Sequence, residues 1–138
     1  MIGYGKMSGC AISALSALAE HYPDPSPLSS LQIAELRNYP QTLVAKVMTT
    51  LSTAGLVTGS RGPGGGYLLA RQPQKICLIE IVRLFEGTKE ALPCPYGPGH
   101  CGSDPPCPMH EQLNRLREEY LDVLEDSTLG VFAEINDS

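Results

Sequence analysis

The spacing of apolar residues in the first part of the chain predicts three helices. Apolar residues recur at intervals of three and four over 10–21, as on the buried face of a helix. A second, short helix is expected over 30–37, where a preceding serine can cap the first turn. A third helix is expected over 40–54, because Pro40 suits the first turn of a helix and Gly55 suits the residue after its end.

The third predicted helix has one apolar face and one small polar face. The inner positions are Leu43, Val44, Val47, Met48 and Leu51, and the outer positions are Gln41, Thr42, Ala45, Lys46 and Thr49. A short helix, a tight turn and a longer helix with a polar outer face are typical of a helix-turn-helix unit that binds DNA. Helix pairs of this kind also occur in ordinary cores, so these helices alone leave that alternative open.

The residues after Gly55 predict a β-hairpin. Two short strands are expected over 56–60 and 66–70, joined by the loop RGPGGG at 61–66. Glycines allow a tight turn, and Arg61 can reach a phosphate or a narrow minor groove. A hairpin directly after a recognition helix is typical of a wing. A nucleotide-binding loop is disfavoured, because that loop needs a following helix and usually a Lys followed by Ser or Thr.

Residues 93–110, PCPYGPGHCGSDPPCPMH, form a cysteine-rich stretch. Cys94, Cys101 and Cys107 are spaced C-x6-C-x5-C, and His110 follows the last of them after two residues. Thiolates are soft ligands suited to iron–sulfur clusters, zinc or copper(I), and a histidine can replace a cysteine at a cluster. Structural zinc, a disulfide pair with one free thiol, and a loop without metal are the alternatives at this point.

Composition narrows the class of protein. The 138 residues suffice for one domain, or for one domain with an appendage, and no run of about 18 apolar residues predicts a membrane span. Five cysteines without a recognisable signal peptide favour reduced thiols and a cytoplasmic location. None of the three histidines lies in a catalytic motif, which argues against an enzyme. An electron carrier would not need a wing.

The last part of the chain predicts a long amphipathic helix that starts at His110. Its apolar residues at helical spacing are Leu113, Leu116, Tyr120, Leu121 and Leu124. This face needs cover, either from the same domain or from a second copy in a two-fold dimer that suits a pseudo-palindromic DNA site. Acidic residues are concentrated here, so much of the net charge of −5 lies away from the predicted DNA-binding face.

Several stretches of the chain together resemble the IscR/NsrR-type winged-helix transcription regulators, many of which carry an iron–sulfur cluster. The matching stretches are IAEL (33–36), AGLV (54–57), RGPGGGYLLA (61–70), LIEIVRLFEG (78–87) and STLGVF (127–132), together with the cysteine loop. The resemblance implies a mainly α fold with a small β-hairpin wing. It implies a winged helix-turn-helix over 1–90, a cluster-binding loop over 91–109, and a dimerisation helix with a C-terminal segment over 110–138.

The same resemblance implies which residues contact double-stranded DNA. They are Gln41, Thr42 and Lys46 in the major groove, and Arg61, Gly62, Gly64 and Gly65 in the adjacent minor groove. Ala45 stands where some members of the family place an acidic residue that tunes base choice. The resemblance therefore does not imply an operator sequence.

The resemblance also implies an iron–sulfur cluster on the three loop cysteines. The family binds 2Fe–2S with a histidine at the position of His110, or 4Fe–4S with an acidic residue near the N-terminus, where this chain has Gly9. Another variant uses a histidine at the end of the second helix, where this chain has Arg37. The resemblance therefore favours His110 and 2Fe–2S, with His100 as the rival ligand. It implies a homodimeric regulator whose DNA binding is switched by the cluster; the alternative is a zinc-stabilised or thiol-based regulator.

Overall fold

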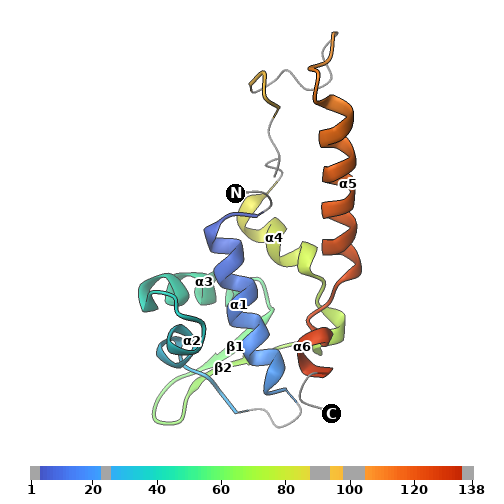
Figure 1. The fold of residues 1–138 in the computed structure, drawn as a ribbon. Helices are drawn as coiled ribbons and strands as arrows, with labels where there is room; N and C mark the ends of the chain where they lie inside the picture. Colours follow the sequence, from blue (N-terminus) through green and yellow to red (C-terminus); the bar gives the residue numbers. More distant parts are fainter. Residues whose placement is uncertain (1–3, 23–25, 88–93, 98–104, 135–138) are drawn as a thin grey trace.

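The fold is mainly helical with one small hairpin, as predicted (Figure 1). The computed structural model describes residues 4–22, 26–87, 94–97 and 105–134. In chain order the elements are α1 (Lys6–Glu20), α2 (Ser30–Arg37), α3 (Gln41–Thr53), β1 (Val57–Ser60), β2 (Gly66–Leu69), the 3-10 helix η1 (Pro73–Lys75), α4 (Leu78–Glu86), α5 (His110–Asp126) and α6 (Gly130–Glu134).

Helix α1 is the central element of the core. Alanines line it, and Ala11, Ala14 and Ala17 are fully buried, which lets neighbouring helices approach closely. Helices α2 and α3 pack on one side of α1, and α4 and α6 pack on the other (Figure 1). Leu15 of α1 and Ile81 of α4 are fully buried in the same cluster. Cutting such a residue to alanine costs about 2–5 kcal/mol, so this cluster stabilises the whole domain.

Helix α1 begins at Lys6, so the predicted start at residue 10 was wrong. No side chain of the first turn caps the helix. Instead, the carboxylate of Glu86, at the end of α4, accepts a hydrogen bond from the Gly5 N–H at 2.5 Å. A backbone donor at a helix start needs an acceptor, and here the acceptor comes from a distant part of the chain. Local sequence therefore carries no cap signal at this start.

Helices α2 and α3 meet in a tight turn, as predicted. Ser29 caps α2 reciprocally with Gln32: the Gln32 side chain accepts from the Ser29 N–H at 2.8 Å, and Ser29 Oγ accepts from the Gln32 N–H at 3.1 Å. Asn38 ends α2 in the left-handed conformation, with φ 58°. Pro40 precedes α3 as its N-cap and does not occupy its first position. Gly55, with φ 81°, follows the end of α3.

Arg37 fixes α2 against α1. Its Nε donates to the Ser13 carbonyl at 3.1 Å and to Ser16 Oγ at 3.2 Å, and its guanidinium pairs with Glu20 at 2.9 Å. Each of these partners lies on α1, which forms the centre of the core. These contacts of α2, the first helix of the helix-turn-helix, therefore attach the unit to α1.

Strands β1 and β2 form an antiparallel hairpin, each one residue shorter than predicted. Tyr67 of β2 also pairs with Leu28, so the hairpin is joined to the segment before α2. Gly66 has φ 152°, and a Cβ added there would lie 2.6 Å from the Leu28 carbonyl carbon. Only glycine permits this close approach of two backbones.

Helix α5 lies beside α4 and extends beyond the body of the domain, and α6 returns to α1 and η1 (Figure 1). Two backbone hydrogen bonds join the chain after α5 to the chain before α4. The Leu78 N–H donates to the Ser127 carbonyl at 3.0 Å, and the Leu129 N–H donates to the Ile76 carbonyl at 3.0 Å. The C-terminal end of α5 is therefore fixed, while its N-terminal end lies with the described loop segment 94–97 at the far end of the molecule.

Candidate DNA-binding surface and cysteine loop

The polar outer face of α3 is exposed, as a recognition helix requires. Gln41, Thr42 and Lys46 are exposed, whereas Val44 and Val47 on the opposite face are fully buried. Because the inner face is locked in the core, α3 presents these polar side chains in a fixed direction. They carry amide, hydroxyl and ammonium groups, which can bond to base edges or to phosphates.

The loop between β1 and β2 presents a cation on a glycine-rich backbone. Arg61, Gly62 and Gly64 are exposed, and the two glycines have φ 94° and 76°. Gly65 differs, because its N–H donates to the Gly62 carbonyl at 2.9 Å and a Cβ added to it would lie 2.5 Å from the Ser60 carbonyl oxygen. Arg61, Gly62 and Gly64 are therefore open to solvent, whereas Gly65 shapes the loop.

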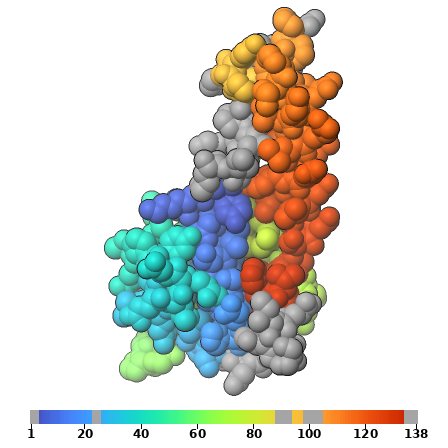
Figure 2. Space-filling view, in the orientation of Figure 1, coloured from blue at the N-terminus to red at the C-terminus, as the bar shows by residue number. Residues whose placement is uncertain are grey.

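Charge is divided between the two sides of the molecule. Helices α2 and α3 and the wing lie on one side of α1, and α5 lies on the other; Figure 2 shows the same division on the surface. Between residues 26 and 70 the basic residues are Lys46, Arg61 and Arg37, the last of which pairs with Glu20 of α1, and the acidic residue is Glu35. On α5 the exposed acidic residues are Glu111, Glu118, Glu119, Asp122, Glu125 and Asp126. This distribution favours the approach of a polyanion to the side of α3 and the wing.

Two of the ligand candidates, Cys107 and His110, lie at the N-terminal end of α5. His110 is the first residue of α5, and its N–H donates to the Cys107 carbonyl at 3.1 Å. Cys107 is 5% exposed, and Cys94 is half-buried in a turn. Cys101 and the rival ligand His100 lie outside the described residues. The structure thus brings Cys107 and His110 together at one helix start.

The imidazole of His110 is oriented by two side chains of α5. Arg117 donates to Asn114 Oδ1 at 2.9 Å, which turns the Asn114 amide nitrogen toward His110 Nε2 at 3.1 Å. An arginine can only donate, so this pairing makes Nε2 an acceptor and places the proton of a neutral ring on Nδ1. Because the Asn114 N–H occupies the Nε2 lone pair, a metal could bind this nitrogen only after the Asn114 amide turns away. Asn114 was missed from the sequence, although its i+4 spacing from His110 is a usable signal.

The donor types fit a soft metal or a cluster. Thiolates and a neutral imidazole suit iron–sulfur clusters and zinc. Within the described ranges, no group of three or more His, Cys, Asp or Glu residues is placed to hold a metal ion. Three of the four predicted ligands, Cys94, Cys107 and His110, lie in the described part of the chain.

The two cysteines outside the loop have structural roles. Cys10 is buried in the core, and this burial raises the pKa of its thiol, which disfavours the thiolate that a metal needs. Cys77 is half-buried. Its backbone pairs with Thr128, and its side chain packs against the core. Neither lies in the cysteine loop.

A helix-turn-helix followed by an antiparallel hairpin, with a polar face exposed on the second helix, defines a winged-helix DNA-binding protein. A family described as iron-dependent transcriptional regulators, Rrf2, matches residues 5–134. The chain therefore belongs to the Rrf2 family. This membership confirms the prediction of a DNA-binding transcription regulator and not an enzyme.

Individual relatives agree with the family. The HTH-type transcriptional repressor NsrR of Streptomyces coelicolor is 32% identical over 120 residues, which are 87% of this chain and 76% of the relative. The HTH-type transcriptional regulator IscR of Vibrio campbellii is 29% identical over 128 residues, 92% of this chain and 74% of the relative. The structure of CymR (YrzC), the global cysteine regulator of B. subtilis, matches with a TM-score of 0.77 and 27% identity over 98% of both chains. The predicted resemblance to IscR/NsrR-type regulators is confirmed.

Proposed function

We propose that the protein is a homodimeric transcription regulator whose DNA binding is switched by a 2Fe–2S cluster on Cys94, Cys101, Cys107 and His110. The observation that carries this proposal is the position of Cys107 and His110 within one turn of each other at the start of α5, directly after the loop that holds Cys94 and Cys101. The family description as iron-dependent and the similarity to IscR and NsrR support it. The cysteine loop supplies soft ligands, and a single histidine among them suits a mixed-ligand cluster.

DNA is bound through α3 and the wing. Gln41, Thr42 and Lys46 enter the major groove, where amide and ammonium groups read base edges or bind phosphates. Arg61 enters the adjacent minor groove, and the exposed glycines beside it let the backbone approach the sugar–phosphate chain. Because its target is DNA, we expect the protein to work in the cytoplasm. None of the described helices is long and apolar enough to cross a membrane.

A second copy covers α5. Part of the predicted apolar face packs on the same chain, since Leu124 is buried there and Tyr120 packs against the core. A line of apolar side chains stays open: Met109, Leu116 and Val123, seven residues apart, are 46%, 38% and 60% exposed. Seven residues make nearly two helical turns, so this line suits the pairing of two helices. A dimer formed in this way would present two recognition helices to a two-fold DNA site.

The loop over 91–109 connects the DNA-reading part, 1–90, with the dimerising part, 110–138. A bound cluster would supply a change of charge and of ligand number when it is reduced, oxidised or lost. Cys107 and His110 would hold the start of α5, and Glu86 holds the end of α4 to α1. A change in the loop would therefore alter the position of α5 relative to α4. For a switch, the protein before and after this change must differ in its affinity for DNA.

Purification under anaerobic conditions, with an absorption spectrum and iron, sulfide and zinc analysis, tests the cluster. We expect a coloured protein with iron and sulfide in equal amounts, and loss of the colour on exposure to oxidant. Duplex DNA selected from a random library should bind the coloured and bleached forms with different affinity. A colourless protein with stoichiometric zinc would contradict the cluster and support a zinc-stabilised regulator.

Similarity to CymR favours a second candidate, a thiol-based regulator without a cluster. The partly exposed Cys94 would then be the reactive thiol. In that case the metal-free protein would bind the selected duplex under reductant and change its affinity on oxidation. Mass mapping of the oxidised protein would locate the modified cysteine, and a Cys94→Ser variant would no longer respond.

A further inference from the structure

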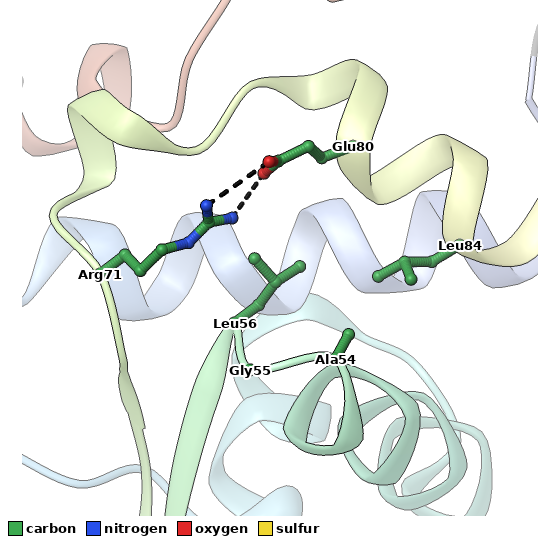
Figure 3. Close-up of a pocket in the computed structure, with 6 residues that line it drawn as sticks. All are labelled: Ala54, Gly55, Leu56, Arg71, Glu80 and Leu84. Carbon is green, nitrogen blue, oxygen red and sulfur yellow. Dashed lines mark hydrogen bonds and ion pairs between the residues drawn. The ribbon is translucent and has the colours of Figure 1, made fainter.

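A groove of about 310 Å³ lies where the wing leaves the body (Figure 3). Its lining residues are Ala54, Gly55, Leu56, Arg71, Glu80 and Leu84. They come from the end of α3, the start of the hairpin, the chain after β2, and α4. In Figure 3 the Arg71 guanidinium points across the groove to the Glu80 carboxylate, above the side chain of Leu56.

The contact between Arg71 and Glu80 is a two-point ion pair. The guanidinium lies 2.5 Å from one carboxylate oxygen and 3.4 Å from the other. The side chains are 39% and 45% exposed, but the Arg71 Nε is buried and has no hydrogen-bond partner among the described residues. A planar guanidinium held by both of its terminal nitrogens has a fixed orientation, unlike a single contact from a flexible side chain.

Both ends of the ion pair are attached to fixed backbone. Next to Arg71, the Ala70 N–H donates to the Leu56 carbonyl at 3.0 Å, which closes the base of the hairpin. Glu80 lies in the first turn of α4, where the helix dipole favours a carboxylate. The ion pair therefore joins the base of the wing to α4, the helix that leads into the cysteine loop.

The pairing argues against a ligand-binding role for the groove. The two charges compensate each other, so the rim offers no free charge to a ligand. It also argues against direct contact between Arg71 and DNA, because a phosphate would have to displace Glu80. A two-stranded ribbon has little stability of its own, so its direction depends on the contacts at its base. Here these include the pairing of Leu28 with Tyr67, the burial of Leu56 and Val57 in the core, and the ion pair of Arg71 with Glu80.

We propose that Arg71 is a positioning residue for DNA binding: with Glu80 it fixes the wing on α4 and so sets where Arg61 meets the DNA. Strands β1 and β2 are paired from Val57 opposite Leu69 to Ser60 opposite Gly66. The direction of the first pair, next to the body of the domain, therefore sets the direction of the loop that holds Arg61. This inference rests on the proposed wing contact of Arg61. It adds a specific link between the wing and the helix next to the proposed sensor.

The test measures affinity and its salt dependence on a duplex selected with the wild-type protein. The variants are Arg71→Gln, Glu80→Gln and the exchange Arg71→Glu with Glu80→Arg. We expect each single variant to weaken binding by about threefold to tenfold, and the exchange to restore most of the loss, because the two residues act as one unit. The salt slope should stay unchanged in Arg71→Gln, because no phosphate contact is lost.

The opposite pattern would overturn the proposal. If Arg71 binds a phosphate directly, Glu80→Gln tightens binding, Arg71→Gln lowers the salt slope by about one, and the exchange does not recover affinity. Unchanged affinity in both single variants also contradicts the proposal. If the single variants fail to fold by circular dichroism, the folded exchange variant decides: native affinity supports the ion pair, and weak binding contradicts it.

A separate variant tests the proposed function on which the inference rests. Arg61→Gln should lower both the affinity and the salt slope. If Arg61→Gln changes neither, the wing contact itself is wrong, whatever the Arg71 variants show. If Arg61→Gln behaves as expected while the Arg71 and Glu80 variants bind normally, only the positioning role fails.

Discussion

Single residues in this protein have roles that depend on what faces them. Gly66 is required because the Leu28 carbonyl lies against it, whereas nothing lies within 4 Å of a Cβ added at Gly55. The ring of His110 is oriented because Asn114, itself bonded to Arg117, donates to its Nε2. Residue type alone gives neither role, because each depends on a neighbour brought close by the fold.

At Gly66, replacement by alanine should destabilise the domain by about 2–3 kcal/mol, through backbone strain and the collision with Leu28. Gly55→Ala is the matched control, since it has a positive φ of 81° but open space around it. It should cost only about 1–2 kcal/mol. Urea unfolding followed by circular dichroism measures both. Equal losses would show that the contact with Leu28 adds nothing to the strain.

At the proposed cluster, His110→Ala should shift the visible absorption spectrum and lower cluster retention. Asn114→Ala keeps the ligand and removes the N–H that occupies the Nε2 lone pair, so it should retain the cluster at least as well as the unchanged protein. His100→Ala is the control and should leave the spectrum unchanged. A larger effect from His100→Ala than from His110→Ala would make His100 the ligand.

Whole elements in this protein are held by contacts from distant parts of the chain. Helix α1 starts where the Glu86 carboxylate accepts from the Gly5 N–H, and α2 is held by Arg37 on α1. The carboxyl end of α4 and the amino end of α1 are therefore joined next to the beginning of the cysteine loop. Tyr120 of α5 lies near this junction: burial raises the pKa of its hydroxyl, and Tyr4 and Glu86 add to the shift.

Removal of the Glu86 acceptor should therefore shorten α1. Glu86→Ala should cost about 1 kcal/mol, the usual effect of losing a helix cap. Glu86→Gln keeps an acceptor oxygen and should cost less. Urea unfolding gives the free energies, and hydrogen exchange of the first-turn amides of α1 shows where the loss occurs. Equal losses in the two variants would mean that charge, and not the acceptor, holds the helix start.

At the scale of the whole molecule, α5 extends from a body that it only partly covers (Figure 1). Its acidic side chains lie on the side away from α3 and the wing, and its open line of Met109, Leu116 and Val123 needs a partner. One helix thus keeps negative charge away from α3 and the wing, and in the proposed dimer it would provide the surface for a second copy.

Charges placed in this line should separate the dimer. Leu116→Glu with Val123→Glu should give a monomer by light scattering after gel filtration, because a buried unpaired carboxylate is strongly unfavourable at an apolar interface. Val131→Glu, at a residue 49% exposed on α6, is the matched control and should remain dimeric. A dimeric double variant would place the interface elsewhere.

The resemblance of whole stretches to known regulators indicated a DNA-binding family. The sequence by itself also determined helices α1, α2, α3 and α5 and the hairpin wing. These features follow from local rules: apolar residues at intervals of three and four, a serine cap before α2, and glycines in the wing loop. Local rules also predicted the end of α3 at Gly55 and the outward position of Gln41, Thr42 and Lys46. Each can be predicted because its cause lies within a few residues along the chain.

Only the tertiary structure decided which residues hold these elements together. The Gly5–Glu86 hydrogen bond, the Arg71–Glu80 ion pair and the contact of Gly66 with Leu28 join positions whose pairing leaves no periodic signal in one sequence. The cysteine loop shows the same division. Ligand types, their spacing and the i+4 pair of His110 and Asn114 are readable along the chain, but the burial of Cys107 exists only in the folded protein.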